Sequence, residues 1–209
     1  MKALQIKSIL LTLTMSLVIV SCGNETKNNG EDSSNKSSTT VEKIKTANNF
    51  VKGARDLTAE SEALKKLTPI SVETFKVFFP ETIYGLPKTN SNAMDMAGAT
   101  TAFATYGQNT SNQINIQIVD GAGEKGSAAT GVFRAIKYDK TNTESNGDYS
   151  KVKEYEGVAV REDFDQGQNR YTLTLFSNER FAVKLKVTGF EQKDVWTIFK
   201  AFNLNNLTN

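Results

Sequence analysis

A short run of carboxylates is the densest group of side chains in this sequence that could do chemistry. Glu162, Asp163 and Asp165 precede Gly167, where a strand is expected to end in a turn. A calcium loop needs oxygen ligands at alternate positions and a later bidentate acid, and Asp163-x-Asp165-x-Gly167 supplies only a fragment of that pattern. Two acids could also serve a glycosidase, but the sequence singles out no pair among its 23 acidic residues. We therefore expect a solvated turn and predict no metal site.

Arginine and tryptophan side chains offer two further kinds of site. Arg161 and Arg170 flank the turn of an expected hairpin, where two guanidinium groups could bind an anion. The preferred interpretation is a cross-strand ion pair of Arg161 with Asp163 or Glu162. Trp196 lies beside the apolar face of the last expected helix. We expect it to cover the sheet rather than to stack on a ligand.

The residue types that most enzymes use for nucleophilic or metal chemistry are scarce. The chain has no histidine and a single cysteine, Cys22, so the usual general base and zinc ligand are missing. The segment from Gly121 to Gly126 has Gly-x-Gly-x-x-Gly spacing after a strand, as in dinucleotide sites. No βαβ unit with a ribose-binding acid follows it, so we expect a glycine turn and no cofactor.

The first 21 residues are typical of a signal peptide. Lys2 and Lys7 precede an apolar core, Ile9–Val20, which is shorter than the roughly 20 residues that a membrane span needs. The sequence Val18–Gly23, which contains Cys22, resembles the lipobox of bacterial lipoproteins, with Val where Leu is commonest. The resemblance implies cleavage before Cys22 and acylation of its thiol and new amine. The alternative is an ordinary secretory peptide with a chance cysteine.

Acyl chains on Cys22 would make the lipid bilayer the first partner of the chain, because each buried CH₂ adds about 0.8 kcal/mol to membrane binding. Residues 22–40 contain no large apolar side chain after Cys22, so we predict a disordered polar tether. This tract is similar to that of Bacteroidota lipoproteins, in which an acidic run next to the cysteine marks surface export. Only Glu25 is acidic close to Cys22. We therefore expect a lipid anchor in the cell envelope, in the outer membrane and facing the periplasm.

Charge argues against nucleic acid as a partner. The chain has 25 basic and 23 acidic residues, and removal of the leader takes away Lys2 and Lys7. The mature chain is then neutral and has no broad basic footprint.

Residues 41–209 are long enough for a single domain with its own core. Helices are expected at Val41–Leu67, from a cap at Ser71 to Phe79, and at Glu191–Phe202, and a helix is preferred for the ambiguous region Gly126–Tyr138. About six strands are expected, at Ala97–Tyr106, Gln113–Val119, Val152–Tyr155, Val158–Phe164, Arg170–Phe176 and Phe181–Val187. In the last of these strands Lys184 and Lys186 lie on the face opposite the apolar residues. The predicted fold is α+β, a single antiparallel sheet backed by the N-terminal and C-terminal helices.

Several short stretches of the expected domain form a recognisable pattern. They comprise Pro69–Lys76, Phe79–Glu81, Gly85–Leu86, Ala104-x-Tyr106, Ile116-x-Ile118-x-Asp120, Val187–Gly189 and Leu204-Asn205-x-Leu207. Together they resemble a family of bacterial envelope lipoproteins. The resemblance covers Pro69 to Leu207 with loose motifs. It implies an architecture and an address, and it carries over no functional residue.

Three functions remain open at this point. The preferred one is a non-catalytic binding or scaffold module of the envelope, with an envelope protein as partner. The second is a hydrolase that acts on glycan or peptide through carboxylates, which would need paired acids of raised pKa in one cleft. The third is an accessory of nutrient capture at the cell surface.

Overall fold

The structure is a computed structural model that describes residues 36–108 and 111–207, with side chains from Val51 onward. It divides into two compact units, Met1–Glu42 and Lys43–Asn209. The signal peptide, Cys22 and the tether up to residue 35 lie outside the described residues. The second unit contains the folded domain, and its α+β class is as the sequence predicted.

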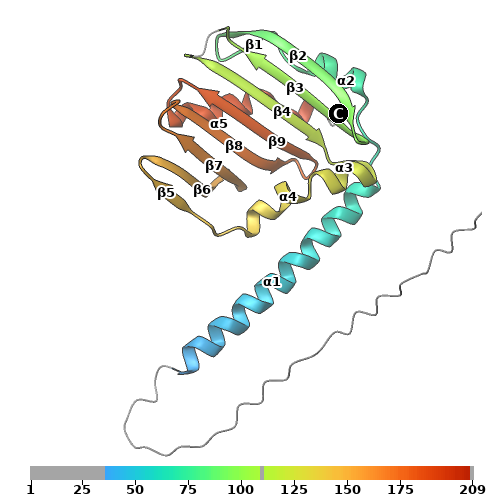
Figure 1. The fold of residues 1–209 in the computed structure, drawn as a ribbon. Coiled ribbons are helices and arrows are strands. Elements are labelled where there is room, and N and C mark those ends of the chain that lie inside the picture. Colours follow the sequence, from blue (N-terminus) through green and yellow to red (C-terminus); the bar gives the residue numbers. More distant parts are fainter. Residues whose placement is uncertain (1–35, 109–110, 208–209) are drawn as a thin grey trace, which may run out of the picture. The chain divides into compact units, whose positions relative to one another are not determined.

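The domain is built on one antiparallel sheet of nine strands, rather than the six or so that were expected (Figure 1). The strands lie in the order β1-β2-β3-β4-β9-β8-β7-β6-β5. Their bounds are Thr82–Ile83 (β1), Leu86–Met96 (β2), Ala99–Tyr106 (β3), Gln113–Asp120 (β4), Thr143–Ser145 (β5), Asp148–Tyr155 (β6), Val158–Asp165 (β7), Arg170–Ser177 (β8) and Phe181–Thr188 (β9). Only the β4–β9 pairing joins strands that are distant in sequence; hairpins make the others.

The strands missing from the prediction are the outermost ones. β2 pairs with β1 through Leu86 and Pro87 only, so it is close to an edge strand, and most of its side chains are exposed. All three residues of β5 are exposed. A strand that buries neither face lacks the alternation of apolar and polar residues by which strands are recognised. The correction therefore concerns strands that carry little of the core.

One face of the sheet carries the core. Ile114, Ile116 and Ile118 of β4 are buried, and they face the same side as Val183 and Leu185 of β9. This covered face packs against α2 (Val72–Phe78), α5 (Gln192–Lys200) and the 3₁₀ helix η2 (Leu204–Leu207), which lie behind the sheet in Figure 1. Burial of each such aliphatic side chain contributes roughly 1.5–3 kcal/mol.

The helices of the covered face follow from local signals. Ser71 caps α2 as expected, because its Oγ accepts a hydrogen bond from the backbone N–H of Thr74 at 3.1 Å. α5 buries Val195, Ile198 and Phe199 on one face, which holds it on the sheet.

The N-terminal helix departs from the prediction. α1 runs from Lys36 to Lys65, so it begins inside the segment expected to be tether. It does not back the covered face. Its described contacts are with α3 (Gly123–Ala129), α4 (Gly131–Arg134) and the 3₁₀ helix η1 (Ala135–Tyr138).

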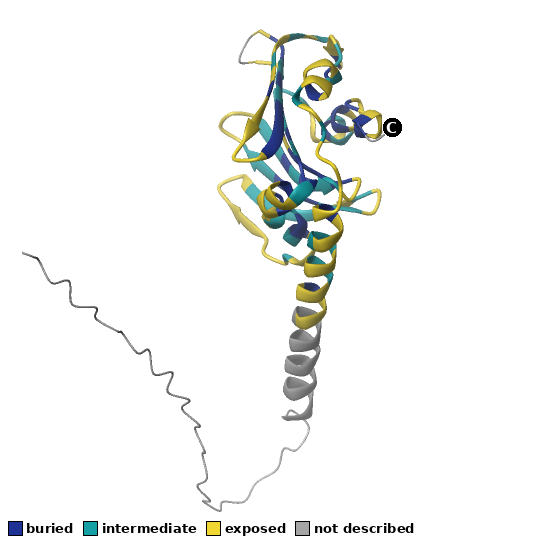
Figure 2. Ribbon diagram, turned by 90° about the vertical axis from the view of Figure 1, so that its right-hand side faces the viewer, coloured by how far each residue is buried: buried dark blue, intermediate teal, exposed yellow. Residues whose placement is uncertain are grey.

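Polar groups dominate this contact of α1. Tyr138 donates to Asp56, and Arg134 donates to the carbonyl of Leu57. Of the apolar stripe predicted to face the core, Leu64 is buried whereas Val51 is about half exposed, at 47%. Figure 2 shows the part of α1 from Val51 onward mostly in the colour of exposed residues. The apolar stripe correctly predicted a helix, but it wrongly predicted which face of this helix is buried.

Candidate functional site

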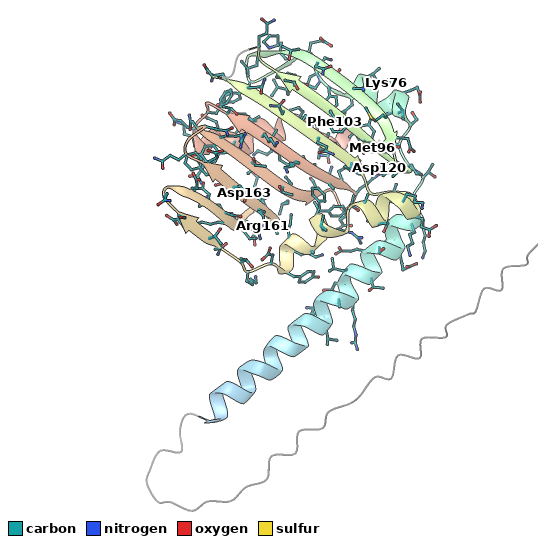
Figure 3. The ribbon with its side chains drawn as sticks, viewed as in Figure 1. Lys76, Met96, Phe103, Asp120, Arg161 and Asp163 are labelled. Atoms are coloured by element: carbon teal, nitrogen blue, oxygen red, sulfur yellow. The ribbon has the colours of Figure 1, made fainter. Side chains whose placement is uncertain are left out.

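The candidate site is the second face of the sheet, here called the open face. It consists of Phe103, Thr105, Asn115, Gln117, Arg161, Asp163, Thr172, Thr174, Lys184 and Lys186. None of these side chains is buried, and Lys184 and Lys186 are exposed. The face points toward the viewer in Figure 1, and Figure 3 labels Phe103, Arg161 and Asp163 on it. Nearby Thr101 and Ala182 are buried, which marks the end of the sheet that α3 and α4 cover.

The strand register sets these residues in two parallel rows. The first row runs across the sheet through Phe103, Gln117, Lys184, Thr174 and Arg161. The second runs through Thr105, Asn115, Lys186, Thr172 and Asp163. Successive residues of a strand point to opposite faces, so the alternation that buries the isoleucines of β4 also presents its amides.

Much of the hydrogen-bonding capacity of this face is unused. Arg161 donates to Ser150 at 2.8 Å and pairs with Asp139, and Asn115 is held by Thr105 at 2.9 Å. The remaining polar side chains have no hydrogen-bond or ion-pair partner in the described part of the chain; they are Gln117, Asp163, Thr172, Thr174, Lys184 and Lys186. They form one contiguous group over β4, β9, β8 and β7.

The covered face has the opposite character at the same strands. Glu162 is fully buried there and accepts hydrogen bonds from Tyr149 at 2.5 Å and Lys153 at 2.6 Å. Tyr155 donates to its second oxygen, and Gln192 of α5 donates at 2.8 Å. These five residues are called the Glu162 cluster. They join the β6–β7 hairpin to the start of α5.

The hydrogen bonds decide the protonation of the cluster. Burial alone would raise the pKa of Glu162, but the donors, Lys153 foremost, outweigh it and lower that pKa below its ordinary value. Burial and the hydrogen bond to Glu162 raise the pKa of Tyr149 and of Tyr155. At neutral pH the carboxylate is therefore ionised and both phenols remain donors.

Aromatic rings enclose the Glu162 cluster on two sides. Tyr149, Phe164 and Tyr171 form a chain of contacts, with centroids 5.6 and 4.5 Å apart. Trp196 stacks on Tyr155 at 5.0 Å. Trp196 thus covers the sheet, in agreement with the sequence expectation. The carboxylate of Glu162 has hydrogen-bond donors on both oxygens, and aromatic rings pack around it. The cluster is therefore suited to hold the β6–β7 hairpin to the start of α5.

The three acids grouped by the sequence are dispersed by the structure. Glu162 lies on the covered face and Asp163 on the open face. Asp165 accepts from the backbone N–H of Gln168 at 3.0 Å and pairs with Arg170 at 3.0 Å, so it closes the β7–β8 turn. Among the described residues, no three His, Cys, Asp or Glu side chains gather in a way that could hold a metal ion.

The expected ion pairs of Arg161 were wrong. Arg161 pairs with Asp139, which follows η1, instead of Asp163 or Glu162. Arg161 faces Thr174 across the strands and Arg170 faces Asp165, so the two arginines form no joint anion site. A buried pair that sequence reasoning missed is Arg180–Asp120, with N–O distances of 2.8 and 2.9 Å. Its partners lie 60 residues apart, beyond the reach of local patterns.

The glycine motif is a packing feature. A helix, α3, does begin at Gly123, but α4 and η1 follow it and no parallel strand returns. A Cβ on Gly126 would lie 2.4 Å from the carbonyl oxygen of Asp120. Gly126 lies inside α3 and lets this helix contact the end of β4, so the expected glycine turn is wrong from Gly123 onward, where a helix begins.

No family model, curated protein or solved structure matches this chain.

Of the open-face residues, the sequence had marked the side of β9 on which Lys184 and Lys186 lie. It could not show that Thr172, Thr174, Asn115 and Gln117 would surround them, because these neighbours come from two other strands, β4 and β8.

Proposed function

We propose that this chain is a lipid-anchored protein of the cell envelope whose domain binds a partner, without catalysis, on its open face. The observation that carries the proposal is the contiguous group of open-face side chains with unused hydrogen-bonding capacity. A solvated array of donors and acceptors is suited to a protein partner, because the rim of a protein interface is polar and an interface contains many hydrogen bonds.

The proposed location of the protein rests on its sequence. The lipobox-like stretch before Cys22 and the polar residues after it support an anchor in the outer membrane, facing the periplasm. In the described part of the chain, no helix has the length and apolar character needed to cross a bilayer.

A hydrolase is the weaker alternative. It would need an acid of raised pKa beside a second carboxylate, whereas the pKa of Glu162 is lowered. Its neighbour Asp163 extends from the other face of the sheet. Nutrient capture at the cell surface would use the same open face with a different partner and leaflet.

The proposal is tested by blocking the open face. Thr174 lies at its centre, between Lys184 and Arg161, and Thr197 lies exposed on α5. The variants Thr174→Trp and Thr197→Trp make the same bulky, neutral change on the two sides of the domain. The lipidated proteins are crosslinked in their own membranes, and captured proteins are quantified by mass spectrometry. We expect Thr174→Trp to lose a stoichiometric partner that Thr197→Trp retains. Equal capture by both variants would contradict the proposal.

A further inference from the structure

Two lysines stand at the centre of the open face. Lys184 and Lys186 belong to β9, which has β4 on one side and β8 on the other. Both side chains are exposed, and neither has a hydrogen-bond or ion-pair partner among the described residues. Two residues apart on one strand, their Cα atoms are separated by about 7 Å on the same face.

The immediate neighbours of these lysines are neutral. Lys184 lies between Gln117 and Thr174, and Lys186 lies between Asn115 and Thr172. The nearest acid across the strands is Asp163, on β7, two strands from Lys186 and therefore about 10 Å away. Neither lysine forms an ion pair with it in the described part of the chain, and the charge of Arg161 is already matched by Asp139. The centre of the open face is therefore positive.

This pair of charges does not stabilise the fold. Lysine is depleted in strands, and two like charges on one face of a strand repel each other. Elsewhere in the described domain many cations are paired with acids, as Lys153 is with Glu162 and Arg180 with Asp120. An intermolecular partner is a sufficient reason for two unpaired lysines in a central strand.

We infer that the open face recognises an acidic segment of a protein partner, with two carboxylates about 7 Å apart in register with Lys184 and Lys186. This rests on the function proposed above and specifies its partner. An extended peptide has that spacing between alternate side chains. Gln117, Thr172 and Thr174 supply donors and acceptors for the remaining polar groups of the segment.

The composition of the face favours a peptide over an acidic glycan. Sugar rings are commonly held against aromatic faces, and Phe103 is the one aromatic residue among the ten of the open face. It lies two strands from Lys184, across Gln117. The residues directly across the strands from the lysines are hydrogen-bonding, and Phe176 of β8, which is diagonal to Lys184, lies toward the end of the sheet that α4 contacts.

A defined probe tests the recognition directly. The probe is a fluorescein-labelled dodecapeptide of alternating Glu and Thr, with a Gln-Thr peptide and an oligogalacturonate as comparisons, and binding is followed by anisotropy. We expect the Glu-Thr peptide to bind and to weaken as salt shortens the screening length. The double variant Lys184→Gln, Lys186→Gln should bind it roughly tenfold more weakly. The control Lys66→Gln, Lys76→Gln removes two exposed lysines outside the open face and should bind as the unaltered protein does.

A zero-length carbodiimide crosslink in native membranes extends the test to the natural partner. We expect a product that joins Lys184 or Lys186 to an Asp or Glu of another protein. Equal binding of the two peptides, no loss in the Lys184→Gln, Lys186→Gln variant, or a preference for oligogalacturonate would each overturn the inference. Loss of the native partner in Thr174→Trp but not in the double lysine variant would overturn it while leaving the proposed function standing. Retention of the partner in both would remove the proposed function as well.

Discussion

The carboxylates of Glu162 and Asp163, adjacent in sequence, occupy opposite faces of β7 and opposite chemical surroundings. Glu162 is fully buried and accepts hydrogen bonds from four residues. Asp163 is partly exposed and has no partner among the described residues. One strand thus places a fully hydrogen-bonded carboxylate on the covered face and an unpaired carboxylate on the open face.

The buried carboxylate should be important for stability. In Glu162→Gln the ionic acceptor is lost, and at least one of the donors from Tyr149, Tyr155 and Lys153 is left without a good acceptor. We expect the free energy of unfolding to fall by about 2–3 kcal/mol in urea titrations. The control Glu154→Gln, exposed on β6 of the same hairpin, should change it by less than about 0.5 kcal/mol. Equal stability of the two variants would show that the cluster does not hold the β6–β7 hairpin to α5.

Stability should depend on pH through the same group. The pKa of Glu162 is lower in the folded protein than its unfolded value of about 4.3. Its contribution is therefore present above that value and is lost as pH falls through the folded pKa. The difference in unfolding free energy between the unaltered protein and Glu162→Gln should be constant from pH 7 to 5 and shrink below about pH 4.3. A difference that stays constant to pH 3 would refute this.

The contributions of Asp120 and Arg180 to the free energy of unfolding should be strongly coupled. Asp120 is fully buried and also accepts from the backbone N–H of Ile70 at 2.7 Å and of Ala122 at 3.1 Å. Asp120→Asn leaves the mostly buried guanidinium of Arg180 without its counter-charge, and we expect a loss of about 3–5 kcal/mol. Arg180→Gln added to it should cost much less than the sum of the single changes. A strictly additive double-mutant cycle, measured by chemical unfolding, would contradict this account.

Glycine at position 126 should be indispensable for packing. In Gly126→Ala the new Cβ would meet backbone atoms, 2.4 Å from the Asp120 oxygen and 2.8 Å from the carbonyl carbon of Gly121. Because backbone cannot move aside cheaply, we expect a loss of about 2–4 kcal/mol. Gly131→Ala is the matched control, since its nearest contact is 3.8 Å away. Thermal unfolding of the two variants should therefore diverge; similar midpoints would rule out the close approach.

The lipid anchor predicts the fate of one substitution. Cys22→Ser removes the only thiol of the chain, which is the atom that acylation requires. We expect the protein to move from the membrane fraction to the soluble fraction on ultracentrifugation, because in the proposed anchor Cys22 would carry all the acyl chains. Ser21→Ala, which leaves the thiol in place, serves as the control. Persistence of Cys22→Ser in the membranes would refute the anchor.

Local signals were sufficient for the elements that bury one face. The alternation of isoleucines in β4, the cap at Ser71 and the apolar face of α5 each predicted the observed element, because burial of one face imposes a period on the chain. The same reasoning failed for β2, which buries little and has no such period. It also misjudged α1, whose apolar stripe does not face the core, because the helix is held by polar groups, with Asp56 accepting from Tyr138 and the carbonyl of Leu57 accepting from Arg134.

The sequence by itself determined which face of β9 would carry polar side chains, and it supplied the lipobox-like stretch on which the proposed anchor at Cys22 rests. Only the tertiary structure decided which side chains from other elements lie beside the polar residues of β7 and β9. The partners of Glu162 come from β6 and α5, and the neutral neighbours of Lys184 and Lys186 come from β4 and β8. The face on which a strand residue lies is a local property of an extended backbone, with a period of two residues. The residue that stands beside it depends on the register between strands far apart in the chain, which is set only when the whole sheet assembles.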